Sequence, residues 1–458
     1  MAFLIGGANS AVSGYDIDNS WRGNGSNSYF NRTLETPTSR RIWTFSAWTK
    51  RVPGTDSNLI SFGPTAQLND LRFNADDKLA WHIDDAVNGT STEIAPVFRD
   101  PSAWYHIVLA VDTTQGTAAN RAKFYVNGTQ ITDFDAAIYP AEDYDFPGLL
   151  ADQVTQVGTR TGNDFGYTTG YLADVAFVDG TQLTPSSFGE TDEDSGIWKP
   201  IKPSPTWGNS GFFLEFNGTG TSADASGKGA DTSGNGNHFD DNNADVYDIT
   251  TDTPTNNFCT MNPLANAMGG TLAEGNLKLT GAAATDKHTF STFGLTSGKW
   301  YFECRDTDQG ARGEVGVTDV DHGLTAVGTN YAHIALHSGG VSSSGTVNSN
   351  VGSGFSDNDI LCVALDLDNG NVWFSEDADI DISGTANVTG LATSGLDREY
   401  RINCRETGNP ATIYELNFGN APYAISSGNA DANGYGNFEH AVPSGYFALC
   451  TKNLAEHG

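Results

Sequence analysis

Short apolar runs alternate with polar, glycine-rich turns along the whole chain, and residues 354–376 show this pattern most clearly. Apolar side chains are concentrated at 360–365 and again at 372–374, on either side of a polar stretch. That stretch contains Asn369-Gly370, and this residue pair readily supplies the positive φ angles of a two-residue hairpin turn. The segment therefore predicts two antiparallel strands joined by a tight turn.

Four further runs have the same character. They span residues 42–47, 104–112, 121–127 and 171–180. The third run ends on Asn127-Gly128, which is a second hairpin signal. No sustained apolar run has helical spacing, so helix is expected to be scarce.

The fold class predicted from these patterns is all-β, with two antiparallel β-sandwiches and a connector that also contains β structure. Three prolines at 199–210 mark a boundary. We place the first domain, with an N-terminal arm, at 1–205, the connector with a strand at 211–216 at 206–263, and the second domain at 264–458. A length of 458 residues is consistent with more than one hydrophobic core.

Three elements of the first domain, in this order, resemble the LamG or concanavalin A-like jelly roll. They are FSAWTKR at 45–51, AWYHIVLAVDTTQ at 103–115 with KFYVNGTQI at 123–131, and YLADVAFVDG at 171–180. The resemblance covers roughly residues 15–205. It implies a jelly-roll sandwich, a fold that also includes glycan hydrolases.

The second domain resembles the SPRY domain, a sandwich that binds partners and performs no chemistry. The resemblance rests on SGKWYFECR at 297–305, GEVGVTD at 313–319, the hairpin at 360–376, YELNFGNAPY at 414–423 and SGYFAL at 444–449. The chain departs from the family at 376–379, where Glu-Asp-Ala-Asp replaces a short Asn-Gly turn. We therefore expect a longer loop at that end of the hairpin.

Two further segments resemble structural proteins of bacteriophages, especially marine ones. They are LTPSSFGETDEDSGIWKPI at 183–201 and DTPTNNFCTMNP at 252–263. This resemblance implies a virion protein exposed on the particle surface.

The formal net charge of −32 argues against nucleic acid as a partner, because no basic stripe is present to neutralise phosphates. Such an excess of acidic residues suits a salty medium, which fits a marine origin without proving one. No run of 18 apolar residues is present, so membrane insertion is not expected. All 5 cysteines lie in the second half, and their odd number and strand positions predict reduced, buried thiols.

Candidate catalytic residues are few. A glycan hydrolase needs two carboxylates flanking the scissile bond, and the nearest match is Glu190-Thr-Asp192-Glu193-Asp194, which lies among glycines. A solvated acidic loop is the expected structure, with catalysis as the alternative. The 9 histidines show no metal-ligand spacing, and no Gly-x-Ser-x-Gly motif occurs. We therefore expect a protein without enzymatic activity.

One segment partly matches the start of a calcium loop. Asp231, Ser233 and Asn235 place oxygen atoms at alternate positions, and Gly236 occupies the sixth. Asn242 stands where a bidentate glutamate is expected, although Asp240 and Asp241 could compensate. A plain Asx/Gly turn is the expected structure, a bound Ca²⁺ the alternative, and no other cofactor is predicted.

Aromatic side chains are the best candidates for sugar contacts, because pyranose rings present apolar C–H faces. Trp43, Trp104, Trp300 and Trp373 lie within strand motifs and are expected in the cores. The aromatic residues near loops or boundaries are the candidate ligand contacts: Tyr167, Tyr171, Trp198 and Trp207.

The function predicted from these observations is that of a tail-associated fibre or receptor-binding component recognising a glycan or protein of the host surface. The alternative is a structural capsid decoration, head-fibre or tail-assembly protein, and a polysaccharide-degrading enzyme is a distant third. Other virion proteins and further copies of the chain are the expected partners. No heptads for a fibre shaft occur, which favours a compact knob.

Overall fold

The computed structural model describes residues 14–63, 68–83, 90–162, 165–282, 287–307, 313–320, 330–352, 354–393, 399–406 and 412–458. The described chain is nearly all β, as the sequence predicted. It divides into two compact units: Ala11–Thr255, here called the first unit, and Asn256–Gly458 with Met1–Ser10, the second unit. Residues 1–13, the greater part of the predicted N-terminal arm, lie outside the described residues.

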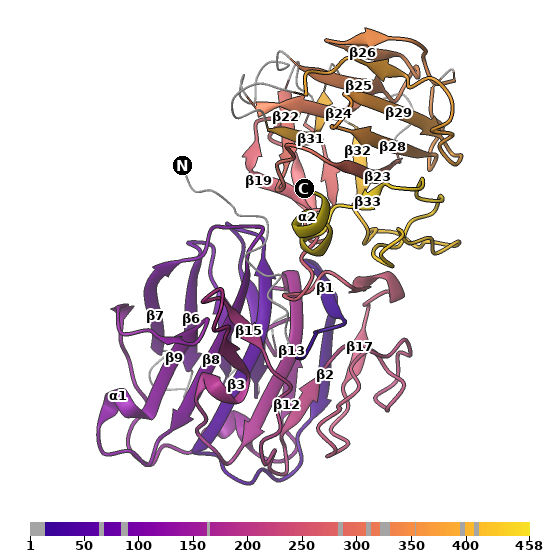
Figure 1. Ribbon diagram of the computed structural model, residues 1–458. Helices are drawn as coiled ribbons and strands as arrows, with labels where there is room; N and C mark the ends of the chain where they lie inside the picture. Colours follow the sequence, from indigo (N-terminus) through magenta and orange to yellow (C-terminus); the bar gives the residue numbers. More distant parts are fainter. Residues whose placement is uncertain are drawn as a thin grey trace. The chain divides into compact units, whose positions relative to one another are not determined.

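The first unit contains 18 strands within its described part (Figure 1). They are β1 (Ser20–Asn24), β2 (Tyr29–Thr33), β3 (Ile42–Arg51), β4 (Ser57–Phe62), β5 (Asn69–Phe73), β6 (Lys78–Ile83), β7 (Thr90–Val97), β8 (Trp104–Asp112), β9 (Ala122–Val126), β10 (Thr129–Gln130), β11 (Phe134–Ala136), β12 (Val154–Val157), β13 (Thr169–Asp179), β14 (Gly189–Thr191), β15 (Trp198–Pro200), β16 (Phe212–Leu214), β17 (Asp240–Asn242) and β18 (Ile249–Thr250). The short helical segments are α1 (Ala118–Arg121) and the 3₁₀ turns η2 (Pro147–Leu149), η3 (Pro185–Ser187) and η4 (Val246–Asp248).

Two 8-stranded sheets enclose the core of the first unit. The β8 sheet runs β10-β9-β8-β3-β13-β1-β18, with β16 also paired to β13. The β5 sheet runs β11-β7-β6-β5-β4-β12-β2-β17. Strands β9 and β10 meet at Asn127-Gly128, where both residues have positive φ, as the two-residue hairpin prediction required.

A third layer covers the outer face of the β8 sheet. It comes from residues 183–207, which include the β14–β15 hairpin, and from residues around Ile17. Phe188 and Leu183 pack on Val108, Ala110 and Val178, which face away from the main core. Strand β13 is therefore buried along both faces.

Buried ion pairs attach part of the predicted connector to the first unit. Lys50 of β3 lies 2.8 Å from Asp252, with both side chains at most 2% exposed. Arg22 of β1 lies 3.3 Å from Asp248, and both side chains are again almost fully buried. Strand β16, within the predicted strand 211–216, pairs with β13. Residues 206–255 thus lie within the first unit, and the compact second unit starts at Asn256.

The second unit contains 15 strands and α2 (Thr451–His457) within its described part. The strands are β19 (Met261–Asn266), β20 (Thr271–Ala273), β21 (Lys278–Thr280), β22 (Lys287–Ser291), β23 (Lys299–Asp306), β24 (Gly313–Asp319), β25 (Tyr331–Ala335), β26 (Val341–Ser343), β27 (Thr346–Val347), β28 (Ile360–Asp366), β29 (Asn371–Glu376), β30 (Val388–Thr389), β31 (Tyr400–Glu406), β32 (Ile413–Asn417) and β33 (Phe447–Ala448). A 6-stranded sheet, β19-β22-β31-β24-β25-β26, and a 9-stranded sheet built around β23 and β28 enclose its core.

The hairpin at 360–376 forms as predicted, but its turn is longer than predicted. Asp366 pairs with Asn371, so four residues connect the strands, and Gly370 has positive φ whereas Asn369 does not. The carboxylate of Asp366 accepts hydrogen bonds from the backbone N–H and the side-chain amide of Asn369. This side-chain cap favours the wider turn over the two-residue form.

Trp373 was expected in the core but lies outside the main one. Trp300 is fully buried, as expected, whereas Trp373 is half-buried and packs against a smaller cluster beside the main core. Its indole N–H lies 3.5 Å from the Gly384 carbonyl in the loop after β29, and Ile380 and Ile382 of the same loop also contact this cluster. That loop spans eleven residues before β30, so this end of the hairpin is long, as expected.

All 5 cysteines are free and buried, which confirms their predicted state. No helix among the described residues is long and apolar enough to cross a membrane.

Candidate functional site

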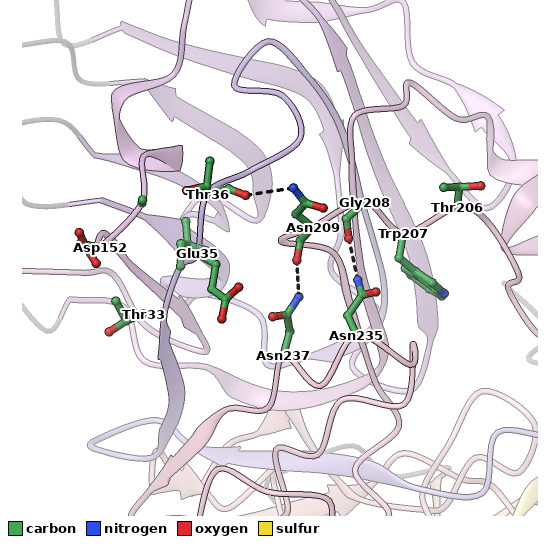
Figure 2. A pocket seen from close by; sticks show the side chains of 12 residues that line it. Thr33, Glu35, Thr36, Asp152, Thr206, Trp207, Gly208, Asn209, Asn235 and Asn237 are labelled. Carbon is green, nitrogen blue, oxygen red and sulfur yellow. Dashed lines mark hydrogen bonds between the residues drawn. The ribbon is translucent and has the colours of Figure 1, made fainter.

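An open groove in the first unit, with a volume of about 1040 Å³, is the candidate functional site (Figure 2). Four segments far apart in the sequence line it: 33–36 at the end of β2, 151–152 before β12, 206–209, and the loop containing Asn235 and Asn237. Its polar lining combines carboxylates, amides and threonine hydroxyls, and Trp207 adds one aromatic ring. A volume near the upper end of the usual range for ligand pockets suits an oligosaccharide better than a single small group.

Asp231 holds the loop that forms one wall of the groove. Its Oδ1 accepts from the backbone N–H groups of Phe213 and Ser233, each at 2.9 Å. Its Oδ2 accepts from the Ser233 hydroxyl at 2.9 Å and from the Asn237 N–H at 2.8 Å. The buried Asp231 carboxylate thereby binds both β16, which contains Phe213, and the loop that contains Ser233 and Asn237.

The two asparagines of this loop hold the opposite segment. The Asn235 amide donates to the Gly208 carbonyl at 2.7 Å, and the Asn237 amide donates to the Asn209 carbonyl at 2.9 Å (Figure 2). Behind the loop, Arg32 donates to Asn237 Oδ1 at 2.6 Å. Because these amide groups bind backbone and a buried arginine, the wall is preorganised before any ligand arrives.

The polar groups that a ligand could contact lie on the side of the groove opposite the asparagine wall. Glu35 and Asp152 are exposed carboxylates on the rim, and the side chains of Thr33 and Thr36 lie beside them (Figure 2). Carboxylates are acceptors for sugar hydroxyl groups. Asp152 has a φ of 64°, a left-handed conformation that asparagine and aspartate tolerate best.

Trp207 is the aromatic part of the groove. Its ring stacks on Phe213, with the ring centroids 5.7 Å apart and an interplanar angle of 20°. Since Phe213 is buried, this contact fixes the orientation of the half-buried indole, which points away from Glu35 and Asp152 in the view of Figure 2. A fixed ring costs little side-chain entropy when a ligand binds.

Of the four aromatic residues predicted as ligand contacts, only Trp207 lines the groove. Tyr171 was wrongly expected on the surface: it is 1% exposed, because the third layer covers β13. Tyr167 is half-buried with its ring 6.1 Å from that of Tyr29.

Trp198 fastens the β14–β15 hairpin to the β8 sheet. Its indole N–H donates to His106 Nδ1 at 3.0 Å, and the two rings stack. Burial lowers the pKa of His106 to about 3, so the neutral ring accepts at Nδ1 and its Nε2–H donates to Ser46. The contacts of Trp198 are therefore those of a packing residue.

The residues of the predicted calcium loop are not brought together as ligands. The Asp231 oxygens already accept four hydrogen bonds from protein groups, and Asp241 forms a buried ion pair with Lys228 at 2.6 Å. Asp240 is exposed on the edge strand β17. The first six positions thus form an Asx turn, and within the described residues no cluster of His, Cys, Asp and Glu is arranged to hold a metal.

The acidic stretch at 190–194 forms an ion-paired hairpin. Lys199 lies 3.1 Å from Asp192 and 3.5 Å from Glu190. Asp192 also accepts from the backbone and hydroxyl of Ser195, and these hydrogen bonds hold the pKa of Asp192 well below its usual range.

Sequence reasoning missed Glu35, Asp152, Asn209 and Asn237. Asn237 belongs to the Gly-Asn-Gly-Asn run at 234–237, whose turn character was visible. Glu35 and Asp152 carried no local signal, because each becomes part of a site only through strand pairing of β2 with β12.

A second polar cluster, on the β8 sheet, contains a buried acid whose pKa is raised. The buried Asp174 accepts from the Tyr15 hydroxyl at 3.0 Å, and the same hydroxyl lies 3.4 Å from Glu215, which pairs with Lys202. Burial raises the pKa of Asp174 to about 8. The neighbouring charges of Glu215 and Asp18 act in the same direction, and that of Lys202 opposes them.

The native protein is expected to lose stability as pH rises, and Asp174→Asn is expected to abolish that loss. Because the folded-state pKa is raised above 3.8, the stabilising contribution of the protonated carboxyl is present below pH 3.8 and is lost as pH rises through about 8. The variant should gain on the order of a few kcal/mol relative to the native protein across that window. Urea unfolding at pH 5, 7 and 9 measures this, with Asp76→Asn as an exposed control, and parallel pH profiles for native and variant protein would contradict it.

One protein-family model matches part of the chain. Residues 23–187 match the model described as the concanavalin A-like lectin/glucanases superfamily, so this part of the first unit is a concanavalin A-like domain. A search of curated proteins gave no match.

Among solved structures the chain is similar to several sandwich proteins. A Bacteroides ovatus protein described as a candidate carbohydrate-binding protein is 16% identical, with 51% of this chain and 59% of that chain covered and a TM-score of 0.32. The heptameric SAP-like pentraxin of Limulus polyphemus is 16% identical, with coverages of 37% and 80% and a TM-score of 0.29. The SPRY domain of human HERC1 is 14% identical, with coverages of 34% and 96% and a TM-score of 0.27.

Proposed function

We propose that this chain is a non-catalytic glycan-recognition protein and that the groove of the first unit holds the sugar. The observation that carries the proposal is the groove itself: a preorganised asparagine wall faces two exposed carboxylates, with one fixed indole in the lining. Saccharide sites need this combination of hydroxyl acceptors and an aromatic surface. The concanavalin A-like domain at 23–187 supports the same reading.

The absence of catalysis is part of the proposal. Of the four carboxylates in the stretch nearest to a hydrolase motif, Glu190 and Asp192 pair with Lys199. Glu193 and Asp194 are exposed in the same hairpin, whereas a general acid needs an environment that raises its pKa. Neither metal nor another cofactor enters the proposed binding. Nucleic acid is not a proposed partner, because a net charge of −32 repels phosphate groups. Membrane insertion is not part of the proposal.

We further propose that the biological setting is a phage particle. The segments at 183–201 and 252–263 support this through their resemblance to phage structural proteins. The chain would then sit on the virion surface beside other virion proteins and further copies of itself, as a tail-associated receptor-binding component. Capsid decoration, a head fibre or a tail-assembly role is the second candidate.

Glu35→Gln and Asp152→Asn are each expected to weaken binding of a neutral oligosaccharide at least tenfold, which corresponds to about 1.4 kcal/mol. The physical reason is the loss of a charged acceptor for sugar hydroxyl groups. A glycan array identifies a neutral ligand, and calorimetric titration measures the affinities. Glu190→Gln, an exposed carboxylate outside the groove, is the matched control.

If Glu35→Gln and Asp152→Asn bound the neutral oligosaccharide as tightly as the control Glu190→Gln, the neutral-sugar site would lie elsewhere. The virion setting has its own test, since excess protein should compete with phage for adsorption to host cells. Failure to compete, together with an ordered position on the capsid shell, would favour decoration. Release of reducing sugar from host polysaccharide would establish an enzyme.

A further inference from the structure

The outer face of the β5 sheet carries a continuous polar row that the groove does not use. Strand register places these residues side by side: Asp240, Asn31, Gln156, Ser61, Asp70, His82 and Ser91. Their chain neighbours Phe30, Val157 and Leu71 point into the core, so the row lies on the opposite face of the sheet. Its middle residues, Gln156, Ser61 and Asp70, are buried, and Ser61 bonds to Thr159 and Thr161 above it. Seven strands at a spacing of about 4.8 Å make it roughly 30 Å long.

Two arginines and a histidine surround Asp70 in this row. Arg72 donates to Asp70 Oδ2, and Arg160 Nε lies 3.3 Å from Oδ1. His82 Nδ1 lies 3.4 Å from Oδ1 and is hydrogen-bonded to Arg160 Nη2 at 3.3 Å. The Asp70 side chain is completely buried beneath them, whereas Arg72 and Arg160 are each 18% exposed. In a chain with only 24 Lys and Arg against 56 Asp and Glu, two arginines on one carboxylate are notable.

The hydrogen bonding of this cluster is incomplete. Asp70 Oδ1, Arg72 Nε and Arg160 Nε are all buried and have no aligned hydrogen-bond partner. A guanidinium carries five N–H donors in a planar fork, and a single carboxylate shared by two forks cannot satisfy both. Buried polar groups without partners are uncommon and indicate a place for a further polar group.

An aromatic ring lies beside the arginines. Phe165 is 41% exposed, which is unusual for so large an apolar side chain, and the Arg72 guanidinium lies over its ring at 5.8 Å from the centroid. A sugar ring can place its C–H face on such a ring while its charged substituent meets the guanidinium groups. Asp56, 3.9 Å from Arg72 Nε, is one-third exposed and limits how much anionic charge the site accepts.

We infer that this arginine face, formed by Arg72, Arg160, His82 and Phe165 above Asp70, binds a carboxylate-bearing saccharide. The carboxylate accepts hydrogen bonds from the exposed part of the two guanidinium groups, whose side chains are each 18% exposed. A carboxylate is expected to bind there more tightly than a sulfate ester, because the sulfate ester is the conjugate base of a much stronger acid and so the weaker hydrogen-bond acceptor. The site is separate from the groove and does not depend on the groove binding neutral sugar.

The test compares three oligosaccharides of equal length: a hexuronate, a neutral hexose and a sulfated hexose. The native protein is expected to bind the hexuronate more tightly than the sulfated sugar. Arg72→Gln/Arg160→Gln should weaken hexuronate binding at least tenfold and leave neutral-sugar binding in the groove unchanged. Glu35→Gln should show the opposite pattern, so that failure of either site is recognised separately.

Removing both arginines leaves Asp70 buried without a counter-charge and could unfold the sheet. Arg72→Lys/Arg160→Lys keeps the charge but lacks the fork, and it should also lose affinity for the hexuronate. Thermal unfolding and the unchanged neutral-sugar affinity check the fold of both variants. Equal hexuronate affinity in the native and lysine proteins, absence of hexuronate binding, or tighter binding of the sulfated sugar would overturn the inference.

Discussion

Lys50→Met is expected to lower the free energy of unfolding of the first unit by about 3–5 kcal/mol, because it removes the counter-charge of the buried Asp252 carboxylate. The pair is separated by 2.8 Å, and both side chains are at most 2% exposed. The effect matters for the architecture, since Asp252 lies within residues that the sequence places in a connector. Calorimetric unfolding of the full chain measures the change in the transition of the first unit.

Two controls accompany this measurement. Lys50→Met/Asp252→Leu should recover most of the loss, since a buried ion pair and a well-packed apolar pair are often of similar stability. Asp143→Asn, which removes the exposed partner of Arg41, should change stability by no more than about 1 kcal/mol. A loss for Lys50→Met as small as that of Asp143→Asn would show that residues 248–255 contribute little to the first unit.

Trp300→Ala is expected to cost the second unit about 3–5 kcal/mol, because the fully buried indole would leave a cavity in the main core. Its N–H donates to the Ser297 carbonyl at 2.8 Å, so that acceptor also loses its partner. Trp373→Ala should cost only about 1–2 kcal/mol, since the indole is half-buried outside the main core. Urea unfolding followed by circular dichroism compares the two variants, and equal losses would contradict the assignment.

Strand positions and turn chemistry were largely predictable because they depend on local sequence. Asn127-Gly128 forms the predicted two-residue turn, with positive φ at both residues. At Asn369-Gly370 the same dipeptide failed to predict the turn length. The Asp366 side chain, three residues earlier, accepts a hydrogen bond from the Asn369 N–H and so favours a longer turn. A short-range side-chain cap thus changed the turn type without changing the hairpin.

Burial of Tyr171 shows the limit of strand patterning. Alternation along β13 separates two faces, but it cannot tell that residues 183–207 return to cover the outer one. The same third layer explains why Trp198, near a loop in the sequence, is held against His106. Aromatic residues near loops were therefore poor indicators of a binding surface here.

The groove was still harder to predict because its parts come from four distant segments. Trp207 and Asn235 were singled out, the first for its position near a boundary and the second as a calcium ligand. In the fold, Asn235 instead donates to the Gly208 carbonyl and so positions the segment that carries Trp207. Backbone N–H groups donate to both oxygens of Asp231, so the segment that resembles a calcium loop forms the expected Asx turn in this structure.

The buried cysteines make this protein a convenient scaffold for a fluorescent reporter. Burial raises the pKa of Cys304, Cys362 and Cys404, so these thiols remain protonated and shielded from maleimides while the fold is intact. A single cysteine introduced at the exposed Thr36 would then react selectively at the groove rim. An environment-sensitive dye at that position would report occupancy of the groove in real time, without separation of bound from unbound ligand.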